Sequence, residues 1–168
     1  TDIQGIVAVA NSDHQTLKPI SSCPGFDPNQ TNGNGDTAAT LAVENSDSDC
    51  LKLLISCLGF DPNQTNGNGD TVATLAVENS DSDCLKLLIA CPGFDPNQTN
   101  KIGDTAATLA AENSDSDCLK LIISCPGFDP NQTNKYGDTA STLAAENSDS
   151  ECIKLLISYS KFNLNRKK

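Results

Sequence analysis

The sequence contains no Met and no Trp, and it has only two Tyr and one His. With 37% hydrophobic residues and so few large side chains, a single thick globular core would be underfilled. Basic residues are also scarce: 11 Lys and Arg stand against 22 Asp and Glu, which gives a formal net charge of −11. A protein of this charge repels phosphate backbones and anionic lipid, so we expect neither nucleic acid nor a membrane as its partner. No apolar run approaches the ~20 residues needed to cross a bilayer, and no charged-then-apolar leader opens the chain.

One interval of 34 residues recurs through the whole chain. The five Phe repeat at this interval, and the eight Cys form two series with the same spacing. These residues are Phe26, Phe60, Phe94, Phe128 and Phe162, with Cys23, Cys57, Cys91 and Cys125, and with Cys50, Cys84, Cys118 and Cys152. A fixed period of this length is typical of a stacked array, in which each unit buries its apolar face against its neighbours. We therefore predict a single domain over 1–168, built from units 1–34, 35–68, 69–102, 103–136 and 137–168.

The two terminal units differ from the others. The first, 1–34, carries polar residues at several positions that are apolar elsewhere. We predict that it is an N-terminal cap, because the ends of an array need a more polar outer face. Pro19 is expected to break or kink its second helix. The last unit, 137–168, ends in the basic segment 166–168, and we interpret it as the C-terminal cap.

Residues 35–68 illustrate what one unit builds. Thr37 is suited to N-cap a short helix over 38–43, whose small side chains permit close packing between neighbouring units. Ser46 and Asp49 have the spacing of a capping box, which predicts the start of a second helix.

That second helix is predicted over 50–56, and it is apolar except for Lys52, which should face solvent. Gly59 is expected to end it. The Pro, Asn and Gly residues that follow exclude a helix, and the Asn66-Gly67 pair predicts a hairpin turn.

Two short antiparallel helices followed by a projecting turn, stacked five times, resemble the ankyrin repeat. The residues that carry the resemblance are Gly35-x-Thr37, Leu41-Ala42, Leu51-x-Leu53-Leu54-Ile55, Gly59 and Asp61-x-Asn63. The resemblance implies an all-α repeat solenoid of stacked helix-turn-helix units with projecting β-turn or hairpin loops. Tetratricopeptide repeats share the period of about 34 residues, but they need two longer helices than these units can hold beside their Pro/Asn/Gly segment.

The chain departs from the ankyrin pattern at three points. The family's Thr-Pro-Leu-His reads Thr-Ala-Ala-Thr here, so Ala39 replaces a Leu, and Thr40 replaces a His and its polar contact. Phe60 stands where the family has a small residue, and we predict that each Phe fills the space its Ala leaves. One extra residue, Leu58 in this unit, lengthens the repeat from the usual ~33 and should enlarge the turn after the second helix.

The sequence offers little to a catalytic or metal centre. Its one His, His14, lies in the divergent first unit, whereas zinc sites need close Cys/His pairs. Cys50 and Cys57 would lie about 10 Å apart along one helix, too far for a disulfide, so we interpret the Cys as small buried hydrophobes. No nucleophile lies beside a base and no Gly-rich phosphate loop follows a strand. We therefore expect no enzymatic activity, no cofactor and no metal.

Two patterns suggest other ligands. Asn45, Asp47 and Asp49 resemble the start of a calcium loop, but Cys50 follows where Gly is needed, and helix capping explains these residues better. A glycosylation sequon recurs at Asn29, Asn63, Asn97 and Asn131. In the ankyrin resemblance this Asn braces the turn between units, which leaves its amide occupied and makes glycosylation unexpected.

The remaining candidate is a surface that binds a protein partner. The ankyrin resemblance implies that the turn tips and the outer residues of the first helices share one concave side. Candidate contact residues are Lys101, Ile102, Lys135 and Tyr136 at the tips, with Asp70, Asp104, Asp138, Glu78, Asn79, Glu112, Asn113 and Glu146 beside them. The acidic positions recur once per unit and would attract a basic partner, or they only keep the chain in solution. Ile102 and Tyr136 are the best candidates for a contact hot spot.

Three interpretations of function stay open. The first is a non-catalytic protein-protein interaction module that binds its partner through the concave face. The second is a structural spacer or scaffold segment of a longer repeat array with no dedicated ligand, and the third is an artificial or consensus-like scaffold. Near-identity of the units favours the second and third. Free thiols and the lack of a leader predict a cytoplasmic protein, and we expect a monomer, with self-association left open.

Overall fold

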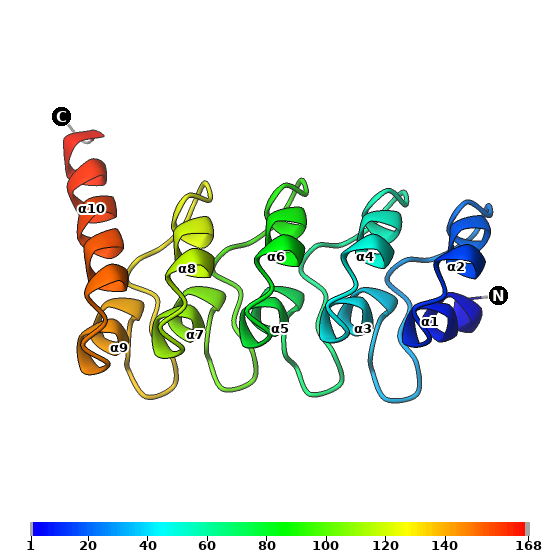
Figure 1. The fold of residues 1–168 in the computed structure, drawn as a ribbon, viewed down its shortest axis with the longest axis horizontal. Helices are drawn as coiled ribbons and strands as arrows, with labels where there is room; N and C mark the ends of the chain where they lie inside the picture. The colour runs from blue at the N-terminus through cyan, green and yellow to red at the C-terminus, as the bar shows by residue number, and fades with distance from the viewer. Residues whose placement is uncertain (1, 167–168) are drawn as a thin grey trace.

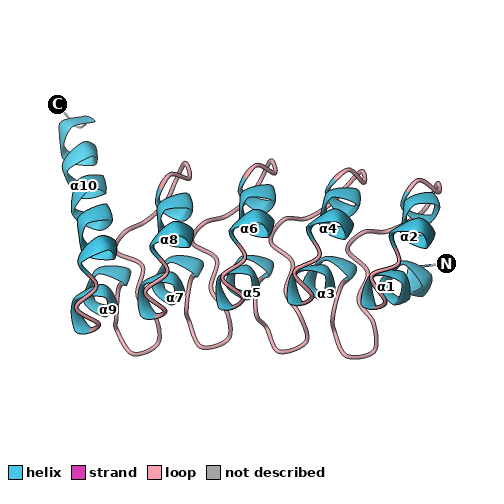
Figure 2. Ribbon diagram, viewed as in Figure 1, coloured by secondary structure: helices cyan, strands magenta, loops and turns pink. Residues whose placement is uncertain are grey.

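The computed structural model describes the backbone of residues 2–166 and the side chains of residues 3–160. The described backbone forms ten helices and no β-strand. The helices are α1 (Asp2–Ala10), α2 (His14–Ser21), α3 (Ala38–Glu44), α4 (Ser48–Ile55), α5 (Val72–Glu78), α6 (Ser82–Ile89), α7 (Ala106–Glu112), α8 (Ser116–Ile123), α9 (Ala140–Glu146) and α10 (Ser150–Arg166). Short turns join the helices in pairs, and a longer loop leads from each pair to the next (Figure 2).

The pairs stack side by side into one elongated array (Figure 1). The odd-numbered helices form one row, which we name the first helices, and the even-numbered helices form the second row, the second helices. The principal helix contacts join the two members of a pair or the counterparts in adjacent pairs, such as α5 with α7 and α6 with α8. This confirms the predicted all-α repeat solenoid, in which each unit is held by its neighbours along the chain.

Pairs of threonines start the first helices. Thr37 is the N-cap of α3, as predicted, and its Oγ1 accepts a hydrogen bond from the N–H of Thr40 at 3.2 Å. Thr40 reciprocates, because its Oγ1 accepts from the N–H of Thr37 at 2.9 Å and donates to the carbonyl of Thr37 at 2.9 Å. The same capping box forms between Thr105 and Thr108 and between Thr139 and Thr142. Thr40 therefore makes a buried polar contact at the position where the ankyrin pattern has His.

The second helices begin differently from the prediction. Asp47, rather than Ser46, is the N-cap of α4, and its Oδ1 accepts from the N–H of Cys50 at 2.9 Å. Ser46 has a φ of +52° and ends α3 instead: its N–H donates to the carbonyl of Val43, while the N–H of Asp47 donates to that of Ala42. These two bonds form a Schellman motif. The capping box expected at Ser46 was wrong because this residue terminates the first helix.

Two predicted helix ends also differ. α4 ends at Ile55, and Gly59 lies beyond it in the loop, with a φ of +82°. Pro19 was expected to break or kink α2; the helix is not broken, because it continues through Pro19 and has the same length as α4. Pro19 removes one backbone donor near the C-terminal end of the helix, and the fully buried Leu17 on the same helix anchors α2 in the core.

The core is a narrow band of small and aliphatic side chains between the two rows. Leu51 and Leu54 of α4 are fully buried, and so is Ala39 of α3. Burial of one such Leu contributes about 2 kcal/mol. In the first pair, Phe26 covers Gly5, the counterpart of Ala39, because a Cβ at Gly5 would lie 2.6 Å from Cε2 of Phe26. In this first pair, where Gly5 replaces the Ala, Phe26 occupies the space in question; that each other Phe fills the space its Ala leaves stays a prediction.

The loops between pairs extend beyond the first helices and turn back there (Figure 1). Asn66 shapes one of these hairpins: its N–H donates to the carbonyl of Asp70 at 3.0 Å, and its Oδ1 accepts from the N–H of Asp70 at 2.9 Å. Gly69 has a φ of +83°, which a residue with a Cβ rarely adopts. The predicted turn therefore forms, with its left-handed residue at Gly69 rather than within the Asn66-Gly67 pair.

Candidate interaction surface

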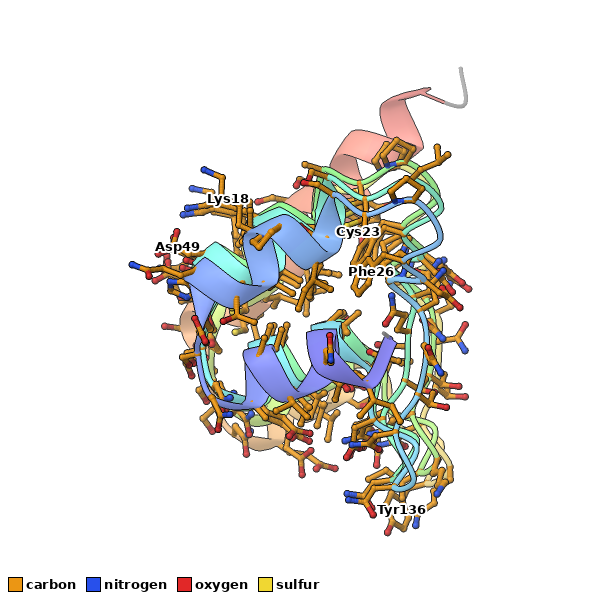
Figure 3. The ribbon with its side chains drawn as sticks, turned by 90° about the vertical axis from the view of Figure 1, so that its right-hand side faces the viewer. Lys18, Cys23, Phe26, Asp49 and Tyr136 are labelled. Carbon is orange, nitrogen blue, oxygen red and sulfur yellow. The ribbon has the colours of Figure 1, made fainter. Side chains whose placement is uncertain are left out.

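The molecule has two exposed sides when it is seen along the array (Figure 3). The hairpin tips project past the first helices, and Tyr136 lies at the end of this projection, whereas Lys18 and Asp49 lie on the side of the second helices. We name the exposed sides of the first helices together with the tips 33–34, 67–68, 101–102 and 135–136 the hairpin face. The exposed sides of the second helices form the back face.

The two apolar tip residues lie on adjacent, touching tips. Ile102 is 43% exposed and Tyr136 is 72% exposed. The N–H of Lys135 donates to the carbonyl of Ile102 at 3.4 Å, which joins the two tips. Nζ of Lys135 lies 4.9 Å from the centroid of the Tyr136 ring, in reach of a cation–π interaction. Together with Lys101, whose Nζ donates to the carbonyl of Gly67 at 3.1 Å, these residues form an exposed tip patch.

The tips pack so closely that Gly67 cannot carry a side chain. A Cβ at Gly67 would lie 1.7 Å from the carbonyl oxygen of Asn34 on the preceding tip. The equivalent residue on the next tip is Lys101, and its aliphatic carbons cover Gly69, where a Cβ would lie 2.5 Å from Cγ of Lys101. Tip residues therefore differ along the array in how much side chain they present.

Three carboxylates gather where the hairpin meets the first helices. Nδ2 of Asn66 donates to Oε1 of Glu44 at 3.2 Å and to Oδ2 of Asp70 at 3.5 Å. Glu78 is exposed overall, but the partial desolvation of its carboxyl raises the pKa, and the negative charges of Asp70 and Glu44 raise it further. We name Glu44, Asp70 and Glu78 the acidic cluster. A positive group placed beside it would relieve this repulsion.

Asp104 differs from the expected surface acid. It is 3% exposed, and its Oδ1 accepts from Nδ2 of Asn134 at 3.0 Å and from the hydroxyl of Thr108 at 3.4 Å. Asp104 therefore braces the next hairpin and is too buried to contact a partner. Asp138 is half-buried, and its N–H donates to Oδ1 of Asn134 at 3.0 Å. The spacing of the acids was visible in the sequence, but their unequal exposure depends on how closely adjacent hairpins pack.

The residues at the ends of the first helices are of two kinds: some donate hydrogen bonds to the preceding unit, and others are exposed to solvent. Asn79 Nδ2 donates to the carbonyl of Val43 at 3.0 Å, and Asn147 Nδ2 donates to the carbonyl of Glu112 at 2.7 Å. These amides therefore satisfy the last carbonyls of the helix in the preceding pair. Glu78, Glu112, Asn113 and Glu146 are exposed. The Glu carboxylates at the ends of the first helices are therefore more available to a partner than the amides of Asn79 and Asn147, which already bond to the backbone.

The sequon asparagine is engaged between units, as the ankyrin resemblance implied. Nδ2 of Asn63 donates to the carbonyl of Gly93 at 2.8 Å, and its Oδ1 accepts from the N–H of Asp95 at 2.8 Å. A glycan on this amide nitrogen would replace a donor hydrogen and crowd the neighbouring loop.

All eight cysteines lie in the described part of the chain and are free. Burial, and after it the adjacent Asp47, raise the pKa of the Cys50 thiol to about 12. Burial likewise raises the pKa of Cys118 and Cys152 to about 12. A thiol with so high a pKa is a poor nucleophile at neutral pH, which fits small buried hydrophobes.

His14 lies in a side-chain cluster that sequence analysis missed. Its Nε2 lies 2.9 Å from Oδ1 of Asp47, and its nitrogen, the Asp47 carboxylate and the Cys50 sulfur all lie within 4.8 Å of one another. Asp47 and Cys50 are neighbours on the same helical turn, whereas His14 lies about one repeat before them in the sequence. The period of 34 residues was the signal that could have brought them together.

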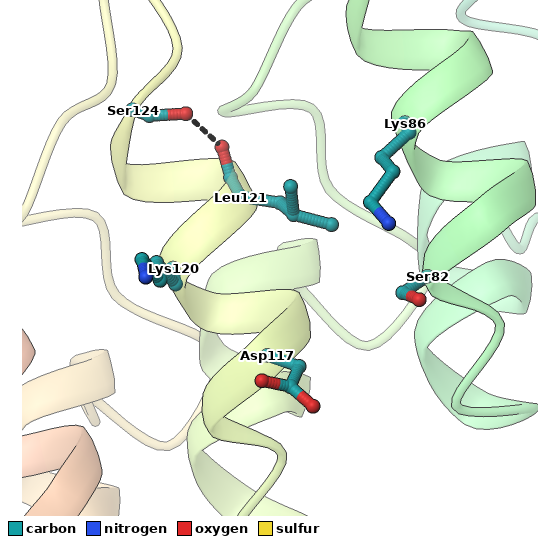
Figure 4. Close-up of a pocket in the computed structure, with 6 residues that line it drawn as sticks. All are labelled: Ser82, Lys86, Asp117, Lys120, Leu121 and Ser124. Carbon is teal, nitrogen blue, oxygen red and sulfur yellow. Dashed lines mark hydrogen bonds between the residues drawn. The ribbon is translucent and has the colours of Figure 1, made fainter.

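A shallow depression of about 450 Å³ lies on the back face between α6 and α8 (Figure 4). It is lined by Ser82, Lys86, Asp117, Lys120, Leu121 and Ser124. The hydroxyl of Ser124 donates to the carbonyl of Leu121 at 2.6 Å within it. Its lining combines charges of both signs with apolar surface, and it supplies matched control positions for the hairpin face.

Comparison with known proteins gives one consistent result. The sequence profile of ankyrin repeats (3 copies) matches residues 6–100 and 75–168. No curated protein matches the sequence. The crystal structure of EF0377, an ankyrin repeat protein, superposes with a TM-score of 0.85 and 24% identity, over 95% of this chain and 82% of that one. Such a likeness shows a shared fold. No helix among the described residues is long and apolar enough to span a membrane.

Proposed function

Because the chain belongs to the ankyrin repeat family, whose repeats generally act as protein-interaction modules, we propose that it binds a partner protein through its hairpin face. The proposal treats the array as one non-catalytic domain over 1–168, with units 1–34 and 137–168 as caps. The side chains of 161–168, the basic segment included, lie outside the described residues.

The observation that carries the proposal is the tip patch. Ile102 and Tyr136 are exposed on two touching tips, and each has a Lys before it in the sequence. An aliphatic and an aromatic side chain held on a braced backbone offer contact area at low entropic cost, as interface hot spots do. The tips of the preceding units carry Gly and Asn at the same positions, so the patch is a local departure from an otherwise repeated surface.

The acidic cluster, which lies beside the tips on the hairpin face, favours a partner segment that carries basic side chains. Glu44, Asp70 and Glu78 already repel one another, and the exposed Glu112 and Glu146 continue the row along the array. Lys or Arg side chains of a partner would be attracted to this row, and the attraction would weaken as salt is added. We propose a partner that places basic side chains on the row and apolar ones on the tip patch.

Affinity capture with matched variants tests the tip patch. The tip variant carries Lys101→Ala, Ile102→Ala, Lys135→Ala and Tyr136→Ala. The control variant carries Lys86→Ala, Lys120→Ala and Leu58→Ala, which removes two Lys and an exposed apolar residue outside the hairpin face. We expect wild type and control to retain the same partners, and the tip variant to lose some of them. Identical partner lists from all three baits would remove the tip patch from the proposal.

Binding of a Lys/Arg-rich peptide, measured by fluorescence anisotropy, tests the acidic row separately. Glu44→Gln with Glu78→Gln should weaken binding and flatten its salt dependence. Asp83→Asn with Asp117→Asn removes the same charge from exposed positions on the second helices and should change little. Equal weakening by both pairs would mean that only net charge matters.

A spacer role is the second candidate, and the regular bracing between units favours it. The Asn63 and Asn79 side chains each bond to the backbone of a neighbouring unit. Such regular bonding holds many units in a stiff line without reference to a ligand. A bait series in which no variant loses a partner would favour this candidate. For either role we propose a monomer in a reducing, cytoplasmic compartment, since the thiols are free.

A further inference from the structure

Three side chains of metal-ligand type meet at the junction between the first two helical pairs. His14 is the first residue of α2, Asp47 is the N-cap of α4, and Cys50 lies in the first turn of α4. Nε2 of His14 lies 2.9 Å from Oδ1 and 3.0 Å from Oδ2 of Asp47. The nitrogen, a carboxylate oxygen and the Cys50 sulfur all lie within 4.8 Å of one another. Packing of adjacent pairs thus brings together donors from different units.

We propose that His14, Asp47 and Cys50 bind a divalent transition metal ion, for which zinc is the best match. Zinc takes imidazole nitrogen, thiolate sulfur and carboxylate oxygen, and three protein ligands leave a fourth position for water. A thiolate in the set disfavours calcium and magnesium, which prefer oxygen ligands. The His14 side chain is 44% exposed, that of Asp47 is 8% exposed and Cys50 is fully buried, so an ion can reach the buried Asp47 and Cys50 from the side of His14.

The equivalent junctions between later units can be compared directly with this site. Position 14 is His only in the first unit, and its counterparts are Ser48, Ser82, Ser116 and Ser150. The Asp and Cys are both kept in the units that follow the first, as Asp81 with Cys84, Asp115 with Cys118 and Asp149 with Cys152. At two of these junctions the Oδ2 atoms of Asp81 and Asp115 are buried without a hydrogen-bond partner, whereas that of Asp47 contacts His14. His14, in place of the Ser found in the other units, therefore adds a third metal ligand to a carboxylate and a thiol that already lie together.

The charges around Cys50 favour a cation. The carboxylates of Asp13 and Asp49, as well as that of Asp47, act on its sulfur. Burial and these charges hold the thiol in its protonated form, so metal binding must displace a proton. Affinity should therefore fall as the pH is lowered, because the Cys50 thiol must release its proton for the metal to bind. The bound ion would tie α2 to α4 and stabilise the first unit.

Titration with Co²⁺ tests the site, because a cobalt–thiolate bond absorbs in the near ultraviolet by charge transfer. Wild-type protein should bind one Co²⁺ with this band, and excess Zn²⁺ should abolish it. His14→Ser, which restores the residue of the other units at an exposed position, should bind at least about 10-fold more weakly, because even residues that merely orient a ligand contribute about 10- to 100-fold. A wild type without the band, or equal affinity in the two proteins, would overturn the proposal.

Ser48→His is the matched gain-of-site variant. It should place an imidazole beside Asp81 and Cys84, bind a second Co²⁺ and double the charge-transfer band. Cys84→Ala in the wild-type background should leave the single site intact. Melting gives an independent readout, since Zn²⁺ should raise the Tm of wild type but not that of His14→Ser. A folded Ser48→His protein that binds no second ion would contradict the claim that these three donors suffice.

Discussion

The side-chain amide of Asn97 joins two adjacent units, because its Oδ1 accepts a hydrogen bond from the backbone N–H of Asp129 at 2.8 Å. Its Nδ2 donates to the carbonyl of Gly127 at 2.8 Å. The same pair of bonds runs from Asn29 to Gly59 and Asp61, and from Asn63 to Gly93 and Asp95. A periodic row of side chain to backbone bonds therefore accompanies the hydrophobic core along the array.

We expect Asn97→Ala to lower the free energy of unfolding by about 1–3 kcal/mol, because two hydrogen bonds of about 0.5–1.5 kcal/mol each are lost. Urea denaturation followed by circular dichroism measures the change. Thr99→Ala, two residues away at an exposed position, is the control and should stay within about 0.5 kcal/mol of wild type. If both variants unfold alike, the amide does not hold the units together.

Burial, rather than residue type, should decide the cost of shortening a leucine. Leu88 is fully buried between the rows, whereas Leu58, the extra residue of its unit, is 99% exposed. Leu88→Ala should cost about 2–5 kcal/mol through lost burial and a cavity. Leu58→Ala makes the same chemical change and should cost less than about 0.5 kcal/mol. Comparable losses in thermal melts of the two variants would contradict the observed packing.

The elements that sequence analysis located correctly are those set by local chemistry. Thr37 caps α3 because a hydroxyl accepts from an N–H three residues on, and this needs no knowledge of the rest of the chain. Lys52 faces solvent because it is the one charged residue in the otherwise apolar stretch 50–55. Ser46 was misassigned because a left-handed residue between two helices ends one of them, and Ser has no strong intrinsic preference for that conformation.

The parts that could not be predicted depend on contacts between units. Asp104 and Asp138 occupy equivalent positions, yet Asp104 is buried because Asn134 of the next hairpin packs on it. His14 looked isolated because its partners, Asp47 and Cys50, belong to the next unit. The period indicated which residues are neighbours, but the distances between their side chains follow from how tightly the pairs stack.

Cys23 should be the thiol that reacts first in the native protein. It is exposed, whereas burial raises the pKa of Cys125 to about 11 and that of Cys50 to about 12. At pH 8 Cys50 therefore stays almost entirely in its protonated form, whereas the thiolate is the reacting form. Limited iodoacetamide labelling followed by peptide mass analysis should modify Cys23, and Cys23→Ser should abolish the fast phase. Early labelling of Cys50 would show that its helix opens readily.

Glu78 should destabilise the fold at neutral pH, and this cost is tied to the proposed binding role. Burial, and then Asp70 and Glu44, raise its pKa above the ordinary 4.5. A carboxyl whose pKa rises on folding holds its proton more tightly in the folded state, so stability falls as the pH rises through that range. Glu78→Gln removes the charge and should slightly raise the Tm at pH 7. Below pH 4.5 the two proteins should melt alike, since the wild-type side chain is then neutral as well.

Glu151→Gln provides a control with the opposite sign. Glu151 lies in the first turn of α10, and one of its carboxylate oxygens lies 3.6 Å from Nζ of Lys154, so its charge favours the helix N-terminus. Its removal should slightly lower the Tm at pH 7. If Glu78→Gln also lowered the Tm, mutual repulsion within the acidic cluster would be refuted. If it raised the Tm while weakening the binding of a basic peptide, the cluster would be a surface whose unfavourable charge is relieved by its ligand.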